Sequence, residues 1–236
     1  MKRLYGLVSF IVFWYLISLI TKVVIPYPHD VIKSFITLYP KELHIHTLAS
    51  SRRLIIGLVI SVVLGVHLGI WLGLSKKAEA LLQPIIYILY PIPKAALLPI
   101  FIILFGIGDL TKIILIVIIV IFPIIINIKD AIQAIPNEYF YVAKSHNLSR
   151  SQMYKDMLIP AILPKLFTTL RISIGIAIAV LYLSENFATF EGLGYYITIY
   201  MTNKLKLFCG ILALSLVGYI LFLIVEFLEK KLCKWV

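Results

Sequence analysis

Long apolar runs separated by short polar segments dominate the chain. A helix needs about 20 apolar residues to cross the hydrocarbon core of a bilayer. Six runs are long enough, so the sequence predicts an all-α membrane protein in which residues 1–236 form a single transmembrane domain. The six spans are expected at about 4–25, 53–74, 85–105, 111–128, 166–183 and 207–227.

The second span carries a regular series of glycines. Gly65, Gly69 and Gly73 follow one another at four-residue intervals, which places them on one helix face. Small residues let helix backbones approach closely in lipid, so we expect this face to pack against another helix. His67, in the same span, is expected to be buried and bonded to a neighbouring backbone group.

Two polar segments flank this span. Residues 26–51 are mixed in polarity and predict an interfacial segment, with an amphipathic helix over residues 30–38 that Asp30 caps. Residues 75–84 are charged and end in proline, which predicts a short turn before the third span.

Prolines interrupt the third span. Pro91, Pro93 and Pro99 lack an amide proton and disrupt the helical hydrogen bonds. Broken backbone is tolerated at membrane depth only where protein or a water-filled cavity covers it. We therefore expect this stretch to form part of the wall of a conduction path, with Pro91, Pro93 and Lys94 as candidate pore-lining residues.

Charged and histidine residues within or beside the spans have competing interpretations. Lys94 either attracts an anionic solute or pairs structurally and snorkels to an interface. Glu185, at the end of the fifth span, is a further pore candidate that pairs with a basic residue, faces water or acts in a gate. Arg171 is expected to be an interfacial anchor. His44 and His46 form an H-x-H pattern without the further ligands of a metal site.

Residues 135–164 form a polar segment that is too long for a tight turn. Pro136 suits the first turn of a helix, and Glu138 favours its positive end. Asn147 can take the left-handed conformation that ends a helix. This predicts a helix over residues 138–146 whose apolar face is formed by Tyr139, Val142, Ala143 and His146.

A second short helix follows in the same segment. Ser149 and Gln152 fit a capping box and predict a helix that continues to about residue 158. Pro160 is expected to end it, and Pro164 to begin the fifth span. The segment is thus interpreted as a rigid helix–corner–helix, with an amphipathic hairpin lying on the headgroups as the alternative.

This segment resembles the EAA loop of binding-protein-dependent ABC importer permeases, in which E-A-A, a glycine and I-x-L-P recur in that order. Pro160, Leu163 and Pro164 match the ending, and Ala143 matches the second alanine. Val142 replaces the first alanine, while Tyr141 stands at the glutamate and Asn147 at the glycine. Beyond the loop, "YPIPKAALLPIFIILFGIGDLTKI" and "EGLGYYI" resemble the nitrate/sulfonate/taurine branch, so that the likeness covers about residues 25–197.

The resemblance implies a type I importer permease with six transmembrane helices, which forms the path for a small polar, anionic solute such as a sulfonate, nitrate or taurine. It implies an ATPase that docks on a cytoplasmic coupling loop, an extracellular substrate-binding protein and a second permease copy in a homodimer. It also implies location in the inner (cytoplasmic) membrane. With an even number of spans, a Lys and Arg count of twelve against eight favours both termini on the cytoplasmic side. No cofactor is expected on this chain, since ATP and Mg²⁺ would bind the ATPase. The expected docking residues are Glu138, Tyr139, Tyr141, Val142, Ala143, His146, Asn147, Ser149, Pro160, Leu163 and Pro164.

Composition and the absence of a nucleotide-binding motif favour a membrane protein over a nucleic-acid-binding protein or an ATPase. Hydrophobic residues make up 61% of the chain, against about half in soluble domains. The net charge of +11 lies between and beside the spans, which favours contact with anionic headgroups over nucleic acid. No G-x-x-x-x-G-K-[ST] is present, so the chain is not expected to be an enzyme that hydrolyses ATP. The alternative function is an ATP-independent secondary transporter or channel, for which acidic relays or inverted repeats would be typical.

Overall fold

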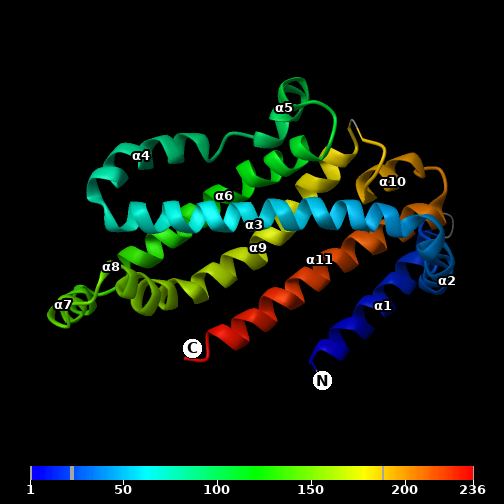
Figure 1. Ribbon diagram of the computed structural model, residues 1–236. Coiled ribbons are helices and arrows are strands. Elements are labelled where there is room, and N and C mark those ends of the chain that lie inside the picture. The colour runs from blue at the N-terminus through cyan, green and yellow to red at the C-terminus, as the bar shows by residue number, and fades with distance from the viewer. Residues whose placement is uncertain (1, 22–23, 188, 236) are drawn as a thin grey trace. The chain divides into compact units, whose positions relative to one another are not determined.

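The computed structural model describes residues 2–21, 24–187 and 189–235, and every regular element in these ranges is helical (Figure 1). The chain divides into two compact units. One comprises Met1–Arg52 and Tyr182–Val217, and the other Arg53–Leu181 and Gly218–Val236. Three long helices begin in one unit and end in the other: α3 (His44–Leu74), α9 (Ile159–Glu185) and α11 (Lys204–Leu232).

The apolar helices follow the order of the predicted spans. Among the described residues, four helical stretches are long and apolar enough to cross a membrane, and a bent pair of helices makes a fifth. A shorter apolar helix, Val8–Thr21, lies within α1 (Lys2–Thr21). The all-α membrane fold is therefore confirmed. The four stretches are Pro28–Leu74, Asp109–Gln133 (α6), Arg150–Glu185 and Lys204–Leu232, and the bent pair is Lys76–Leu89 (α4) with Lys94–Phe105.

The first unit contains the helices at the beginning of the chain. After α1 come α2 (Pro28–Leu38), the π-helical turn η1 (Tyr39–Leu43) and the start of α3. The expected helix at residues 30–38 is present, but its N-cap is Tyr27 and not Asp30, which lies in the first turn. Pro28 explains the shift, because its fixed φ suits the first position of a helix. Helical structure is then continuous into α3, so the second span extends well before residue 53.

The second unit is built around a close seam between α3 and α6. A Cβ atom added at Gly69 would lie 2.7 Å from Cβ of Ile128 and 3.0 Å from the carbonyl oxygen of Ile125. Gly57, Gly65 and Gly73 approach other isoleucines of α6 as closely. The prediction that the glycine face packs against a helix is confirmed, and α6 is that helix.

Two boundaries differ from the prediction in this unit. Residues 75–84 are not a turn, because the Ser75 side chain accepts a hydrogen bond from the amide of Ala78 (3.2 Å) and starts α4 at once. Pro84 lies inside α4. Helix α6 likewise continues to Gln133, past Pro123. In membrane helices such prolines are tolerated because neighbouring helices and local adjustments satisfy the carbonyl that loses its hydrogen bond.

Candidate functional site

The segment between α6 and α9 begins with α7 (Asn137–Ser145). Pro136 is its N-cap and not part of its first turn, while Glu138 lies in that turn, where a carboxylate favours the positive helix end. The side chains of Tyr139, Tyr141 and Val142 are 60%, 70% and 55% exposed. Of the face predicted from Tyr139, Val142, Ala143 and His146, only Ala143 is buried.

Asn147 forms the corner after α7. Its φ of 51° is the only positive φ of a non-glycine residue in the described part of the chain. The amide of Leu148 donates to the Ala143 carbonyl (3.0 Å), and the amide of Asn147 donates to the Lys144 carbonyl (3.0 Å). These two bonds define a Schellman motif, a helix ending usually made by glycine. The left-handed role predicted for Asn147 is confirmed.

A capping box starts the next helix. The Ser149 amide donates to Oε1 of Gln152 (2.9 Å), and the Gln152 amide donates to the hydroxyl oxygen of Ser149 (3.3 Å). The box predicted from these two residues is therefore present. It begins α8 (Arg150–Gln152), which is followed by the π-helical turn η3 (Met153–Leu158) and then by α9.

The prediction that Pro160 ends the second helix is wrong. Helical structure runs without a break from α8 through η3 into α9, with Pro160 in the first turn of α9 and Pro164 inside that helix. The Ile159 amide bonds to the Tyr154 carbonyl in the wider π pattern. Pro160, which has no amide proton, lies where the hydrogen bonding changes from the π to the α pattern. The helix can therefore continue past it. Leu163 and Pro164 are half-buried on α9.

His67 of α3 differs from its prediction in one respect. Its Nδ1 lies 2.7 Å from the Val63 carbonyl oxygen, so the expected backbone partner is present. The side chain is exposed and not buried. Its ring stacks on Tyr154 of η3, with centroids 6.2 Å apart.

The interrupted span forms a sharp bend between α4 and the 3-10 turn η2 (Lys94–Leu97), which leads into α5 (Leu98–Phe105). The two halves are bent by 79°. Lys94 is only 9% exposed, and its Nζ donates to the carbonyls of Leu89 and Tyr90 at 2.8 Å each. The ammonium also lies 4.5 Å from the ring centroid of Phe122, within range of a cation–π contact. Of the two roles left open for Lys94, this geometry favours the structural one, because the cation satisfies carbonyls that the end of α4 leaves unpaired. Pro91 and Pro93 are exposed at the bend.

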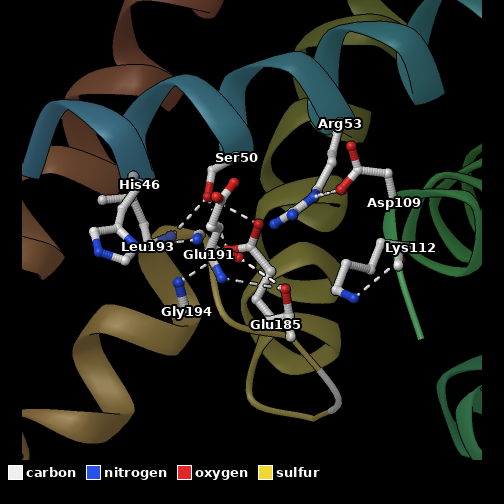
Figure 2. Close-up of polar contacts among 12 residues, drawn as sticks. His46, Ser50, Arg53, Asp109, Lys112, Glu185, Glu191, Leu193 and Gly194 are labelled. Carbon is white, nitrogen blue, oxygen red and sulfur yellow. Dashed lines mark hydrogen bonds and ion pairs between the residues drawn. The ribbon is translucent and has the colours of Figure 1, made fainter.

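In the first unit, the end of α9 carries a fully buried carboxylate (Figure 2). Glu185 accepts hydrogen bonds from the Ser50 hydroxyl, at 2.9 Å to Oε1 and 2.8 Å to Oε2, and from the Gly194 amide at 2.9 Å. The Ser50 oxygen in turn accepts from the Leu193 amide (2.8 Å). Glu185 thereby joins α3 to the start of α10 (Leu193–Ile199).

Glycine is required beside this carboxylate. Gly192 has a φ of 125°, and a Cβ atom there would overlap the carboxylate of Glu185. The Gly192 amide donates to Nδ1 of His46 (3.2 Å), which gives that histidine a structural role. No group of metal-ligating side chains occurs among the described residues. The roles of Ser50 and His46 were missed because nothing in the local sequence connects α3 to residues 192–194.

Glu42 forms a second polar cluster in the same unit. It accepts a hydrogen bond from the Tyr196 hydroxyl (2.8 Å) and pairs with Lys206 (2.9 Å). Burial and the bond to Glu42 raise the pKa of the Tyr196 hydroxyl well above its usual range, so this group remains a donor. The ammonium of Lys206 also lies 4.1 Å from the Tyr200 ring centroid. These contacts fix α10 between η1 and the start of α11.

The second unit has buried cations of its own at the turn into α6. Arg53 is 3% exposed and pairs with Asp109 at 2.7 Å (Figure 2). Lys112, 2% exposed, donates to the Gly108 carbonyl at 3.0 Å. Gly108, Asp109 and Lys112 belong to the "GIGDLTK" stretch, which is part of the resemblance described above, whereas Arg53 lies on α3. They fix the turn that connects α5 to α6.

The geometry is thus a helical scaffold with one exposed, capped loop and several internal polar clamps. Comparison with known proteins identifies its class. Residues 61–234 match the family described as "Binding-protein-dependent transport system inner membrane component". The chain belongs to this family. The permease is therefore a non-enzymatic, multi-pass membrane subunit of an ABC importer, a class that works with an ATPase and a substrate-binding protein.

Individual relatives agree with this assignment. The permease is 32% identical over 224 residues to the putative aliphatic sulfonates transport permease SsuC of Bacillus subtilis, covering 93% of the permease and 80% of the relative. It is 28% identical over 228 residues to the taurine transport permease TauC of Escherichia coli, covering 93% and 82%. A chain of the inward-facing methionine ABC transporter MetNI matches with a TM-score of 0.64 at 18% identity, covering 80% and 93%. This last likeness concerns the fold, and it supports the type I importer architecture.

Proposed function

We propose that the permease imports a small anion of the sulfonate, taurine or nitrate type, using ATP that a partner subunit binds with Mg²⁺ and hydrolyses. The proposal for the solute is supported by the relatives named for aliphatic sulfonates and taurine, each matched over 93% of the chain. The permease itself would bind no cofactor and supply the path. A substrate-binding protein would deliver the solute.

The exposed loop carries the proposal for ATP-driven transport. Tyr139, Tyr141, Val142 and Leu148, here called the docking surface, lie around the Asn147 corner and are 38–70% exposed. Apolar side chains grouped on a polar loop are typical of interaction sites, and tyrosine is enriched among the residues that dominate binding energy. The Schellman motif and the capping box hold the loop in one shape. Little conformational entropy is then lost when a partner binds.

One substitution tests the docking surface. Tyr141→Ala removes the most exposed of these side chains, and we expect the affinity for the cognate ATPase subunit to fall about tenfold or more. The measurement is binding of the purified ATPase to detergent-solubilised permease. Phe190→Ala is the matched control, since Phe190 is also an exposed aromatic (83%) but lies in another loop. Equal affinity of both variants and the unmodified permease would overturn the docking proposal.

Reconstitution tests the energy source and the solute together. We expect vesicles containing the permease, its ATPase and its binding protein to take up a labelled alkanesulfonate only when ATP is present. Competition by taurine and by nitrate measures the range of anions. ATP-independent uptake by the permease alone would instead support a secondary transporter or channel.

The bend at Pro91–Lys94 is proposed as part of the wall of the path. Lys94 would shape this wall by holding the carbonyls of Leu89 and Tyr90. Lys94→Ala is expected to reduce uptake while leaving ATPase binding intact. Unchanged uptake would remove the bend from the proposed path.

Assembly and orientation follow from the same proposal. Two permease copies would enclose the path as a homodimer, in the inner (cytoplasmic) membrane, with the docking surface and both termini on the cytoplasmic side. Trp235 supports a common side for the C-terminus and the loop, because it lines the same cleft as Tyr139. Cross-linking of tagged copies in membranes tests the homodimer. Labelling of single cysteines introduced at exposed positions such as Tyr141 from either side of the membrane tests the orientation.

A further inference from the structure

The end of α11 is joined to the first half of α9 within the second unit. Nη1 of Arg171 lies 2.8 Å from Oε2 of Glu229, and Nη2 donates to Oε1 at 3.0 Å. Both side chains are largely shielded, at 28% and 22% exposure. A bidentate arginine–carboxylate pair fixes the relative orientation of the two side chains as well as their distance. Arg171 therefore links two helices and does not serve only as the interfacial anchor expected from the sequence.

The residues after this ion pair turn back toward residues 135–164, here called the docking loop. The Cys233 amide donates to the Glu229 carbonyl (2.7 Å), and the Cys233 side chain is 7% exposed. Trp235 then lines a cleft together with Tyr139 of α7, Met157 of η3 and Pro160 of α9. The C-terminal segment thus meets each helical part of the docking loop except α8.

These contacts give α11 two attachments to the same moving part. Because α8, η3 and α9 are continuous, a displacement of α7 by a bound ATPase is transmitted along them. Arg171 lies on α9, C-terminal to the junction of η3 and α9. Trp235 lines the cleft beside that junction. A helix fixed at two points moves with its neighbour as one body, which is how closely packed helices pass on a conformational change.

We propose that Glu229–Trp235 forms a brace that makes α11 follow the docking loop, with Arg171 and Glu229 as positioning residues for transport. The brace rests on the proposed function, in which α7 receives the ATPase. It adds that the C-terminal end of the permease is required to convert ATP hydrolysis into solute movement. The brace adds to the apolar packing of α11 on α9, as at Gly218 and Ile178, so that without it α11 follows α7 to α9 less closely.

Charge reversal tests the ion pair. Arg171→Glu and Glu229→Arg each place like charges together, and the double variant restores an opposite pair. Coupling between sites is typically worth about 5- to 150-fold. We therefore expect each single variant to lower the solute imported per ATP hydrolysed by at least about fivefold, and the double variant to recover it. ATPase binding and ATP hydrolysis should persist in all three.

Lys230→Gln is the matched control for these variants. It removes the ion pair of the exposed Lys230 with Glu226 (2.7 Å), four residues earlier on the same helix. We expect normal import per ATP. Normal coupling in both single variants, or no recovery in a double variant that binds the ATPase, would overturn the brace.

A second variant keeps the test decisive if the charge reversals do not assemble. Trp235→Ala changes only the end of the chain, and we expect lowered import per ATP with normal ATPase binding. Unchanged import per ATP would overturn the brace on its own. Failure of the docking proposal shows differently, as unchanged ATPase affinity in Tyr141→Ala, so the two proposals are tested by separate measurements.

Discussion

Helix α9 has a loop at each end, and the two loops are stabilised in opposite ways. The loop before it, residues 134–158, is closed by hydrogen bonds between near neighbours, such as Ser149 with Gln152. The loop after it is closed by Glu185 and Ser50, which are 135 positions apart. The first loop leaves Tyr139 and Tyr141 exposed, whereas the second surrounds a fully buried carboxylate.

This difference separates the surface proposed to bind a partner from a clamp that stabilises the fold. Local caps keep the first loop in shape without using its apolar side chains, which remain available for binding. The second loop satisfies its carboxylate internally, and burying a charge is costly unless such partners are present. Damage to the first loop should therefore affect partner binding, and damage to the second should affect stability.

Glu185→Gln should have the largest effect on stability. The amide replaces a carboxylate that accepts bonds from Ser50 and Gly194, so one buried donor loses its partner. Leaving a buried donor without its partner costs about 1–3 kcal/mol, and more where the lost acceptor was charged. We expect thermal unfolding of the permease in detergent to shift strongly downward. Glu138→Gln in the exposed loop is the control, and a similar shift in both variants would remove the distinction between the loops.

Gly192→Ala comes next in size. The substitution forces a side chain into a φ of 125° and against the Glu185 carboxylate. Such strained backbone costs about 1–3 kcal/mol. Thermal unfolding measures the loss. Gly175→Ala, where no atom lies within 4 Å of the added Cβ, is expected to be neutral or slightly stabilising. Equal melting temperatures for the two variants would show that the loop after α9 is not tightly clamped.

The same contrast explains what the sequence could predict. The Asn147 corner, the Ser149 capping box and the glycine face of α3 depend on spacing within a few residues, and all three are confirmed. The bonding of Glu185 to Ser50 depends on how distant segments pack, so local spacing carried no signal for it.

Prolines were the weakest guide to helix ends. Pro160 was expected to end a helix and Pro84 to end a turn, yet both lie within helices. The missing amide proton of a proline breaks a helix only where an α-helical hydrogen bond depends on it. Before Pro160, the π-helical turn η3 already shifts the hydrogen-bonding pattern, so the helix continues. Lys94 also could not be assigned from sequence alone, because its partners are backbone carbonyls, which every residue has.

Ser149→Ala removes the N-cap of the first loop and should have a moderate, local effect. Loss of an N-cap side chain costs about 1 kcal/mol. Because the box is local, we expect faster hydrogen exchange at the amides of Gln152 and Met153 while thermal unfolding of the whole permease is unchanged. Ser151→Ala is the control, because Ser151 is exposed and lies two residues after Ser149. A global loss of stability from Ser149→Ala would mean that this loop is part of the core after all.

Asn147→Gly should have the smallest effect and gives the sharpest view of the corner. Glycine adopts positive φ without penalty, so we expect the loop to keep its shape and the ATPase affinity to change little. Asn147→Ala should cost about 1–2 kcal/mol, because alanine resists the left-handed conformation that the 51° φ requires. Hydrogen exchange at the Leu148 amide, which bonds to Ala143, reports the corner directly. If alanine is tolerated as well as glycine, the conformation of Asn147 does not set the shape of the docking surface. The capping box at Ser149 would then have to hold the loop alone, and the Ser149→Ala variant should lose ATPase affinity to the same extent as Tyr141→Ala.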